Sequence, residues 1–110
     1  MGIDLERVGR VTENLWAYLF DTEERQWLME APPTARQERA TILFSAKESF
    51  YKAQFSWRRR WLDFRDVHVV VEGERLWVWD LTEPGSLPYA GRQASTLELV
   101  ATTFCCTREL

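Results

Sequence analysis

Three carboxylates and two lysines, held in two short stretches, have the residue types and spacing that could carry out chemistry. The first stretch is Gly2-Ile3-Asp4-Leu5-Glu6. Residues two apart on a strand point to the same face, so we expect Asp4 and Glu6 to project together while Ile3 and Leu5 face the core. Neighbouring carboxylates raise each other's pKa unless a cation lies between them, and Mg²⁺ prefers such oxygen ligands. A solvent-facing strand edge would also explain this stretch, which does not decide the matter alone.

The second stretch follows about forty residues later and reads Phe44-Ser45-Ala46-Lys47-Glu48-Ser49-Phe50-Tyr51-Lys52. Glu48 and Lys52 are four residues apart, so they share one face of a helix. Such a pair on a surface contributes about 0.3–0.5 kcal/mol and needs no further role. The same two groups could instead hold a cation and phosphate oxygens. Spacing alone favours the surface ion pair.

Three helices are expected after the first motif, and the second of them carries the acidic pair Glu23-Glu24. The predicted helices run from a cap at Thr12 or Asn14 to Phe20, from Asp21 or Thr22 to Glu30 or Ala31, and from a cap at Thr34 to between Phe55 and Arg59. Their starts rest on capping residues and their apolar positions on helical spacing. The longest helix then carries the second motif.

Strands are expected after the last helix. Alternating residues from Val67 to Val71 and from Leu76 to Trp79 flank a turn at Glu72-Gly73-Glu74, which is a hairpin pattern. The stretch 83–91 holds two prolines and two glycines and is predicted to be a loop, and 97–105 is predicted to be a last strand. The predicted fold is α+β, with three helices packed on a small antiparallel sheet in a single domain over residues 1–110.

Composition restricts the kind of partner. The chain has a net charge of −3, which does not suggest a nucleic-acid-binding protein. Residues 36–60 nevertheless carry seven basic and two acidic side chains, so this segment is +5 and the remainder −8. A basic segment indicates either a solvated helix face or a phosphate or acidic-protein partner. No signal peptide or membrane span is evident, and two adjacent cysteines fit a reducing compartment, so a cytoplasmic location is expected.

The two motifs in this order and spacing resemble the paired signature of the 4′-phosphopantetheinyl transferases, most closely the surfactin- and enterobactin-type branch. The resemblance extends to Phe20–Leu28, similar to that family's acidic segment, and to Trp61-Leu62-Asp63-Phe64, similar to its entry into the sheet. It implies a single transferase-like unit that moves the phosphopantetheine arm of coenzyme A onto a carrier-protein serine. It also implies coenzyme A and an acyl or peptidyl carrier protein as partners.

The resemblance implies roles residue by residue. Asp4, Glu6 and Glu48 would hold Mg²⁺ against the diphosphate, and Glu48 would also help to remove the serine proton. Lys47 and Lys52 would bind phosphate oxygens, and Lys52 would steady the departing 3′,5′-ADP. The remaining assignments are weaker. Glu24 or Glu23 is a further acidic candidate, His68 is expected to be a partly exposed strand residue, and Arg58-Arg59-Arg60 either guide a carrier protein or offset the helix dipole.

The chain departs from the long branch in matching only its second half, whereas coenzyme A lies between the two halves of those enzymes. Three explanations fit: a fragment, a half-unit that assembles with itself, or a chain that pairs with a separate N-terminal half. We therefore expect a homo-oligomer or such a pairing. The alternative function is a non-catalytic carrier-protein- or metal-binding half-domain.

Overall fold

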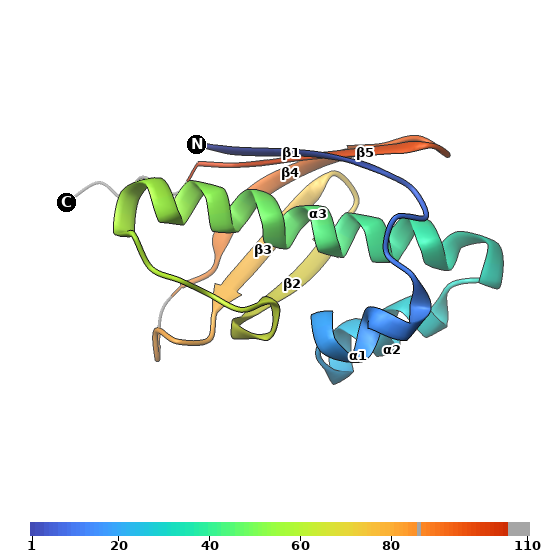
Figure 1. Cartoon of the computed structure of the whole chain (residues 1–110), viewed down its shortest axis with the longest axis horizontal. Helices are drawn as coiled ribbons and strands as arrows, with labels where there is room; N and C mark the ends of the chain where they lie inside the picture. The colour runs from blue at the N-terminus through green and yellow to red at the C-terminus, as the bar shows by residue number, and fades with distance from the viewer. Residues whose placement is uncertain (86, 106–110) are drawn as a thin grey trace.

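A five-stranded antiparallel sheet forms one layer of the structure, a computed structural model that describes residues 1–85 and 87–105 (Figure 1). The strands lie in the order β1-β5-β4-β3-β2, so β1 and β2 are the edges. Their bounds are β1 Gly2–Arg7, β2 Val67–Glu72, β3 Arg75–Asp80, β4 Tyr89–Ser95 and β5 Leu99–Phe104. The first and last strands of the chain are therefore neighbours.

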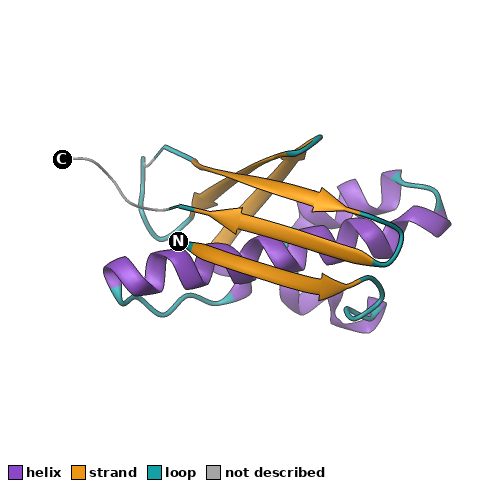
Figure 2. Ribbon diagram, turned by 90° about the horizontal axis from the view of Figure 1, so that it is seen from above, coloured by secondary structure: helices purple, strands orange, loops and turns teal. Residues whose placement is uncertain are grey.

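Helices form the second layer and lie on one side of the sheet. They are α1 Trp16–Leu19, α2 Thr22–Glu30 and α3 Pro33–Arg58, with short 3-10 turns η1 Glu13–Leu15 and η2 Phe64–Asp66. In Figure 2 the strands β1, β5 and β4 face the viewer with no helix in front of them, and α3 lies behind. The predicted fold class, three helices on a small antiparallel sheet, is confirmed.

The helix ends follow local chemistry that the sequence predicted only in part. The helix α2 starts at Thr22, within the predicted range, and Asp21 caps it: the Asp21 side chain accepts from the Glu24 backbone N–H while the Glu24 side chain accepts from the Asp21 N–H. The Thr34 cap was wrong. The N-cap of α3 is Pro32, two residues earlier, and the helix begins at Pro33, whose fixed φ suits the first helical position. It ends at Arg58, and the capping residue Arg59 adopts the left-handed conformation with φ 59°.

The strand β4 was missed, because Tyr89–Ser95 is rich in small and polar residues and begins inside the predicted loop. Within this strand, position 91 must be a glycine. A Cβ atom at this position would lie 2.4 Å from the Phe104 ring, so the ring packs directly over the backbone of β4. The glycine that suggested a loop therefore allows two strands to share one aromatic side chain.

The core lies between α3 and the inner face of the sheet. Phe50 on α3 packs against Phe104 and Tyr89, with ring centroids 5.7 and 5.1 Å apart. Phe20, Leu28, Leu43 and Leu76 are also fully enclosed. In the described part of the chain, no helix combines the length and the apolar character needed to cross a membrane.

Candidate active site

Asp4 and Glu6 lie on the inner face of β1, against α3. Asp4 is 5% exposed, whereas Ile3 and Leu5 are 61% and 64% exposed. Asp4 and Glu6 therefore share a face as predicted, but the expectation that Ile3 and Leu5 face the core was wrong. The helices cover only the inner face, so the alternation of the strand turns its carboxylates toward α3 and its apolar residues outward.

Gly2 allows β1 to come unusually close to α3. A Cβ atom at Gly2 would lie 1.8 Å from the Ser49 carbonyl oxygen and 2.7 Å from the Ala53 nitrogen. No side chain fits in that space. The first residue of the Gly-Ile-Asp motif thus brings the strand that carries Asp4 against the helix that carries Glu48.

Lys52 links the helix to this strand. Its ammonium group donates to Asp4 Oδ1 at 3.0 Å and to the Ile3 carbonyl oxygen at 3.3 Å. Its side chain is 49% exposed, while that of Asp4 is 5% exposed. The lysine therefore reaches from solvent to a buried carboxylate. The other oxygen of that carboxylate, Asp4 Oδ2, is buried and has no hydrogen-bond partner among residues 1–85 and 87–105.

The carboxylates affect one another's protonation. Burial, the adjacent Asp4 side chain and its charge raise the pKa of Glu6 from 4.5 to about 7, against the lowering effect of Arg10. Burial and the Asp4 charge also raise the pKa of Glu48, with Lys52 and Arg10 opposing. Asp4, Glu6 and Glu48 are thus within electrostatic reach of one another. They are not as compact as Asp21, Glu24 and His68, whose ligand atoms all lie within 4.8 Å of one another.

Lys47 points into the interior instead of toward this cluster. Its side chain is 1% exposed, and its ammonium donates to Glu24 Oε1 at 2.8 Å. It also donates to the carbonyl oxygens of Leu19, Phe64 and Val67 at 2.9, 2.7 and 3.1 Å. Burial lowers the pKa of Lys47, and the charge of Glu24 counteracts this effect. With these acceptors in place Lys47 is not free to bind phosphate in this structure, which corrects the expectation from the motif.

Glu24 is likewise an internal residue. Its Oε1 accepts from Lys47 and from the Asp21 backbone N–H, and its Oε2 accepts from the Val69 N–H at 2.8 Å. Both oxygens are used, so Glu24 does not join Asp4 and Glu6. Glu23, the other acidic candidate, is 85% exposed and lies 3.8 Å from His68 Nε2.

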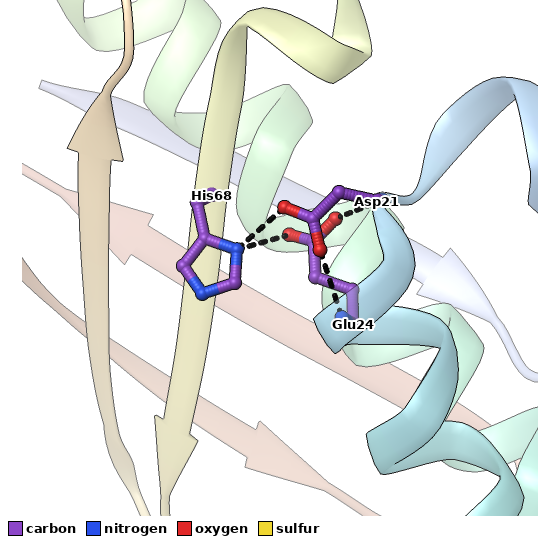
Figure 3. Close-up of side chains that lie close together, drawn as sticks. All are labelled: Asp21, Glu24 and His68. Atoms are coloured by element: carbon purple, nitrogen blue, oxygen red, sulfur yellow. Dashed lines mark hydrogen bonds and ion pairs between the residues drawn. The ribbon is translucent and has the colours of Figure 1, made fainter.

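His68 and Asp21 complete a compact cluster around Glu24 (Figure 3). His68 Nδ1 lies 2.6 Å from Asp21 Oδ2 and 3.9 Å from Glu24 Oε2. Although burial opposes it, hydrogen bonds from the Glu24 N–H and from His68 lower the pKa of Asp21. His68 is partly exposed on its strand, as expected, and its contacts fasten β2 to the start of α2.

The arginines at the end of α3 contact the chain itself. Arg58, whose side chain is 12% exposed, pairs with Asp80 at 2.6 Å and also contacts Glu83. Burial opposes it, but hydrogen bonds from Thr82 and Arg58 lower the pKa of Asp80. Arg60 donates to Thr82 Oγ1 at 2.8 Å. Arg58 therefore anchors the helix end to the β3–β4 connection.

A cavity of 260 Å³ opens beside Glu48. Its lining is mostly aromatic and aliphatic and includes Glu48, Tyr51, Trp61, Leu62, Phe64 and Val67. The sequence analysis did not identify this cavity. The signal was present in the aromatic residues that follow Glu48, but only the chain reversal after α3 brings Trp61 and Phe64 back beside the helix.

Comparison with known proteins identifies the family of this chain. A family model described as the 4′-phosphopantetheinyl transferase superfamily matches residues 1–105. The chain belongs to this superfamily. The 4′-phosphopantetheinyl transferase Npt of Nocardia iowensis is 34% identical over 74 residues, which are 67% of this chain and 32% of Npt. The matched stretch thus spans about a third of that curated relative.

Two solved transferase structures share the fold. The holo-[acyl-carrier-protein] synthase of Thermotoga maritima is 17% identical with a TM-score of 0.62, and the match covers 97% of this chain and 63% of that one. The Bacillus anthracis holo-(acyl-carrier-protein) synthase, solved in complex with CoA (3′,5′-ADP), is 16% identical with a TM-score of 0.63. That match covers 92% of this chain and 89% of the synthase. At these identities the likeness supports the fold alone.

The two lysines of the superfamily motif are predicted to differ in their contribution to stability. Lys47→Met should lower the free energy of unfolding by about 3–5 kcal/mol, because it leaves the Glu24 charge buried without its partner. Lys52→Met, the matched control, should cost roughly 1 kcal/mol, because its pair is half exposed. Urea denaturation followed by tryptophan fluorescence measures both. Equal losses for the two variants would contradict the structural role of Lys47.

The raised pKa of Glu6 predicts a pH dependence of stability in EDTA. The native chain holds this proton more tightly than the unfolded chain, so Glu6 stabilises the fold at low pH and loses this contribution as pH rises from about 4.5 to 7. Glu48 acts in the same direction. Between pH 5 and pH 8, the free energy of unfolding should therefore fall less for Glu6→Gln than for the original chain, by on the order of 1 kcal/mol. Parallel stability curves for the variant and the original chain, measured by urea denaturation across this range, would show that Glu6 titrates normally.

Proposed function

We propose that this chain provides the metal-binding half of a magnesium-dependent 4′-phosphopantetheinyl transferase, which moves the phosphopantetheine arm of coenzyme A onto a carrier-protein serine. The observation that carries the proposal is the position of Glu48. The charge of Asp4 acts on its carboxyl group, and Glu48 also lines the cavity together with Trp61 and Phe64. Glu48 thus connects the cavity to Asp4 and Glu6, and we call Asp4, Glu6 and Glu48 the acidic cluster.

The acidic cluster has the donor chemistry of a Mg²⁺ site. Asp4 Oδ2 is a buried carboxylate oxygen without a hydrogen-bond partner, which is costly unless a cation satisfies it. Burial first, and the neighbouring Asp4 second, raise the pKa of Glu6 and of Glu48, and a cation among the three carboxylates would oppose both effects. Asp4, Glu6 and Glu48 are the proposed ligands. Mg²⁺ bound there would neutralise the diphosphate of coenzyme A.

Glu48 is the proposed general base. As the serine oxygen attacks the phosphorus that bears the pantetheine arm, its proton passes to the Glu48 carboxylate. The bond between that phosphorus and the bridging oxygen of the diphosphate breaks, and 3′,5′-ADP leaves. Glu48 lines the cavity, so its carboxylate is placed to accept this proton.

Lys52 is the proposed phosphate ligand. Its side chain is half exposed and its ammonium already lies beside Asp4, so it can contact both the acidic cluster and an arriving phosphate. Its charge would stabilise the departing 3′,5′-ADP. Lys47 stays with Glu24 and holds the helix in place.

The cavity beside Glu48 is the proposed site for the pantetheine arm. This arm is long, thin and uncharged, which suits a lining of Tyr51, Trp61, Leu62 and Phe64. The Tyr51 hydroxyl is buried without a hydrogen-bond partner in the protein, so it is available to an amide of the arm.

The outer face of the sheet is the proposed assembly surface. Ile3, Leu5 and Leu99 are exposed there, 61%, 64% and 44%, and no described helix covers them. An exposed apolar patch of this kind indicates a protein interface. The occupant we propose is a second copy of this chain, with a separately encoded first half as the other outcome of the test. A cytoplasmic location is part of the same proposal.

Glu48→Gln is predicted to abolish transfer while keeping the fold. The change removes a base and a metal ligand but preserves the side-chain volume, so the rate should fall at least a hundredfold. The assay incubates the chain with coenzyme A, Mg²⁺ and an apo carrier protein, with and without a first half from a long member of the superfamily, and reads the carrier's intact mass. Glu38→Gln, the same change on the same helix, is the control.

Two results would contradict this function. Transfer at the wild-type rate by the Glu48→Gln variant would exclude Glu48 as the base. No transfer by the wild-type chain, even with a first half added, would overturn the proposed activity and favour a non-catalytic carrier- or metal-binding role.

The assembly surface predicts a homo-oligomer that depends on Leu5. Leu5→Lys places a charge in the centre of the apolar patch and should shift the chain toward monomer, whereas Met29→Lys, at an exposed position on α2, should not. Light scattering over a concentration series measures the mass of each variant. We expect weak or no transfer by the chain without a first half. A wild-type monomer at high micromolar concentration that transfers phosphopantetheine would contradict both expectations.

A further inference from the structure

Three buried hydroxyl groups join α3 to β5 directly beneath the acidic cluster. Ser45, Ser49 and Thr102 are all fully buried, and we call them the hydroxyl cluster. The Thr102 Oγ1 atom lies 2.8 Å from Ser45 Oγ and 2.7 Å from Ser49 Oγ. It also donates to the Ser45 carbonyl oxygen at 2.9 Å. Thr102 is thus hydrogen-bonded to two successive turns of the helix, and the Ser49 hydroxyl can also donate to the Ala46 carbonyl oxygen at 3.2 Å.

Apolar residues would fill this space at lower cost. A buried hydroxyl must be hydrogen-bonded to offset its loss of water, whereas alanine and valine carry no such requirement. What hydroxyl bonds add is direction. Apolar packing is less directional, whereas three hydrogen bonds to one oxygen favour a single position of α3 relative to β5.

The hydroxyl cluster is coupled to both halves of the acidic cluster. Thr102 is the cross-strand partner of Asp4, and Ser49 directly follows Glu48 on α3. Ser49 also provides the carbonyl oxygen against which Gly2 packs. The same turn of α3 is therefore held against β5 by hydroxyl bonds and against β1 by close backbone contact. The strand with Asp4 and the helix with Glu48 have their separation fixed at this point.

We propose that Thr102, with Ser45 and Ser49, is a positioning residue that sets the distance between the carboxylates of β1 and Glu48, and thereby tunes the affinity for a divalent cation. This inference rests on the proposed function, because it takes Asp4, Glu6 and Glu48 as the ligands. Residues that orient metal ligands without touching the metal commonly change affinity by about 10–100-fold when substituted.

The test compares two buried threonines. Thr102→Val removes the central hydroxyl and keeps the shape of the side chain. Thr41→Val is the matched control, since Thr41 is also fully buried and donates to the Gln37 carbonyl oxygen at 2.7 Å, but has no contact with the hydroxyl cluster among its described bonds. The probe is Mn²⁺ alone, with free ion measured by electron paramagnetic resonance, alongside thermal unfolding of each variant.

We expect Thr102→Val to weaken Mn²⁺ binding roughly tenfold, Thr41→Val to leave it unchanged, and Thr102→Ser to restore it. Both valine variants should lower the melting temperature, so stability alone cannot produce this pattern. If Thr102→Val does not fold, Ser49→Ala, which removes one bond to Thr102, should give the same loss in smaller measure. Wild-type Mn²⁺ affinity in the folded variants would overturn the positioning role. No Mn²⁺ binding by the wild-type chain would instead overturn the proposed metal site, and this inference with it.

Discussion

The buried ion pair between Lys47 and Glu24 is the interaction on which the rest of the structure depends. The two side chains are 1% and 0% exposed, and bonds within the chain offset their loss of water: the Lys47 ammonium has four acceptors, and Glu24 accepts from Lys47 and from two backbone N–H groups. Those partners come from the end of α1, from α2, from η2 and from β2. One ammonium group thus holds four segments against α3, and the loss of Glu24 would leave this buried charge without the carboxylate that pairs with it.

This pair also determines which residues of the second motif can face the acidic cluster. Because Lys47 turns inward, Glu48 and Lys52 are left on the side of α3 that meets β1 and the cavity. On a third side, Ser45 and Ser49 face β5. The stretch 45–52 of α3 therefore contacts three different parts of the fold, and different residues of the motif face each part. That division explains how so short a motif can specify both a fold and a site.

Local chemistry predicted much of the fold, and long-range packing decided the rest. The alternation at 67–79 predicted the hairpin nearly residue for residue. The start of α2 was also predicted, at Asp21 or Thr22. The strand β4 could not be predicted, because Gly91 suggests a loop until Phe104 is known to lie over it. The site shows the same limit. The spacing of Asp4 and Glu6 gave their shared face, but only the position of the helices shows that this face is buried. The inward turn of Lys47 depends on Glu24, 23 residues away.

The acidic cluster lowers the stability of the fold. Burial at the contact between β1 and α3 raises the pKa of Glu6 and Glu48 and leaves Asp4 Oδ2 without a partner, which an ordinary core would avoid. Moving β1 one residue along would turn Ile3 and Leu5 inward and bury two apolar side chains instead. Three constraints prevent this slip: the space that only Gly2 fits, the pairing of Asp4 with Thr102, and the reach of Lys52 to Asp4. Residues that would be more stable elsewhere are thus held in a register that keeps carboxylates together, and this cost is what an arriving cation can relieve.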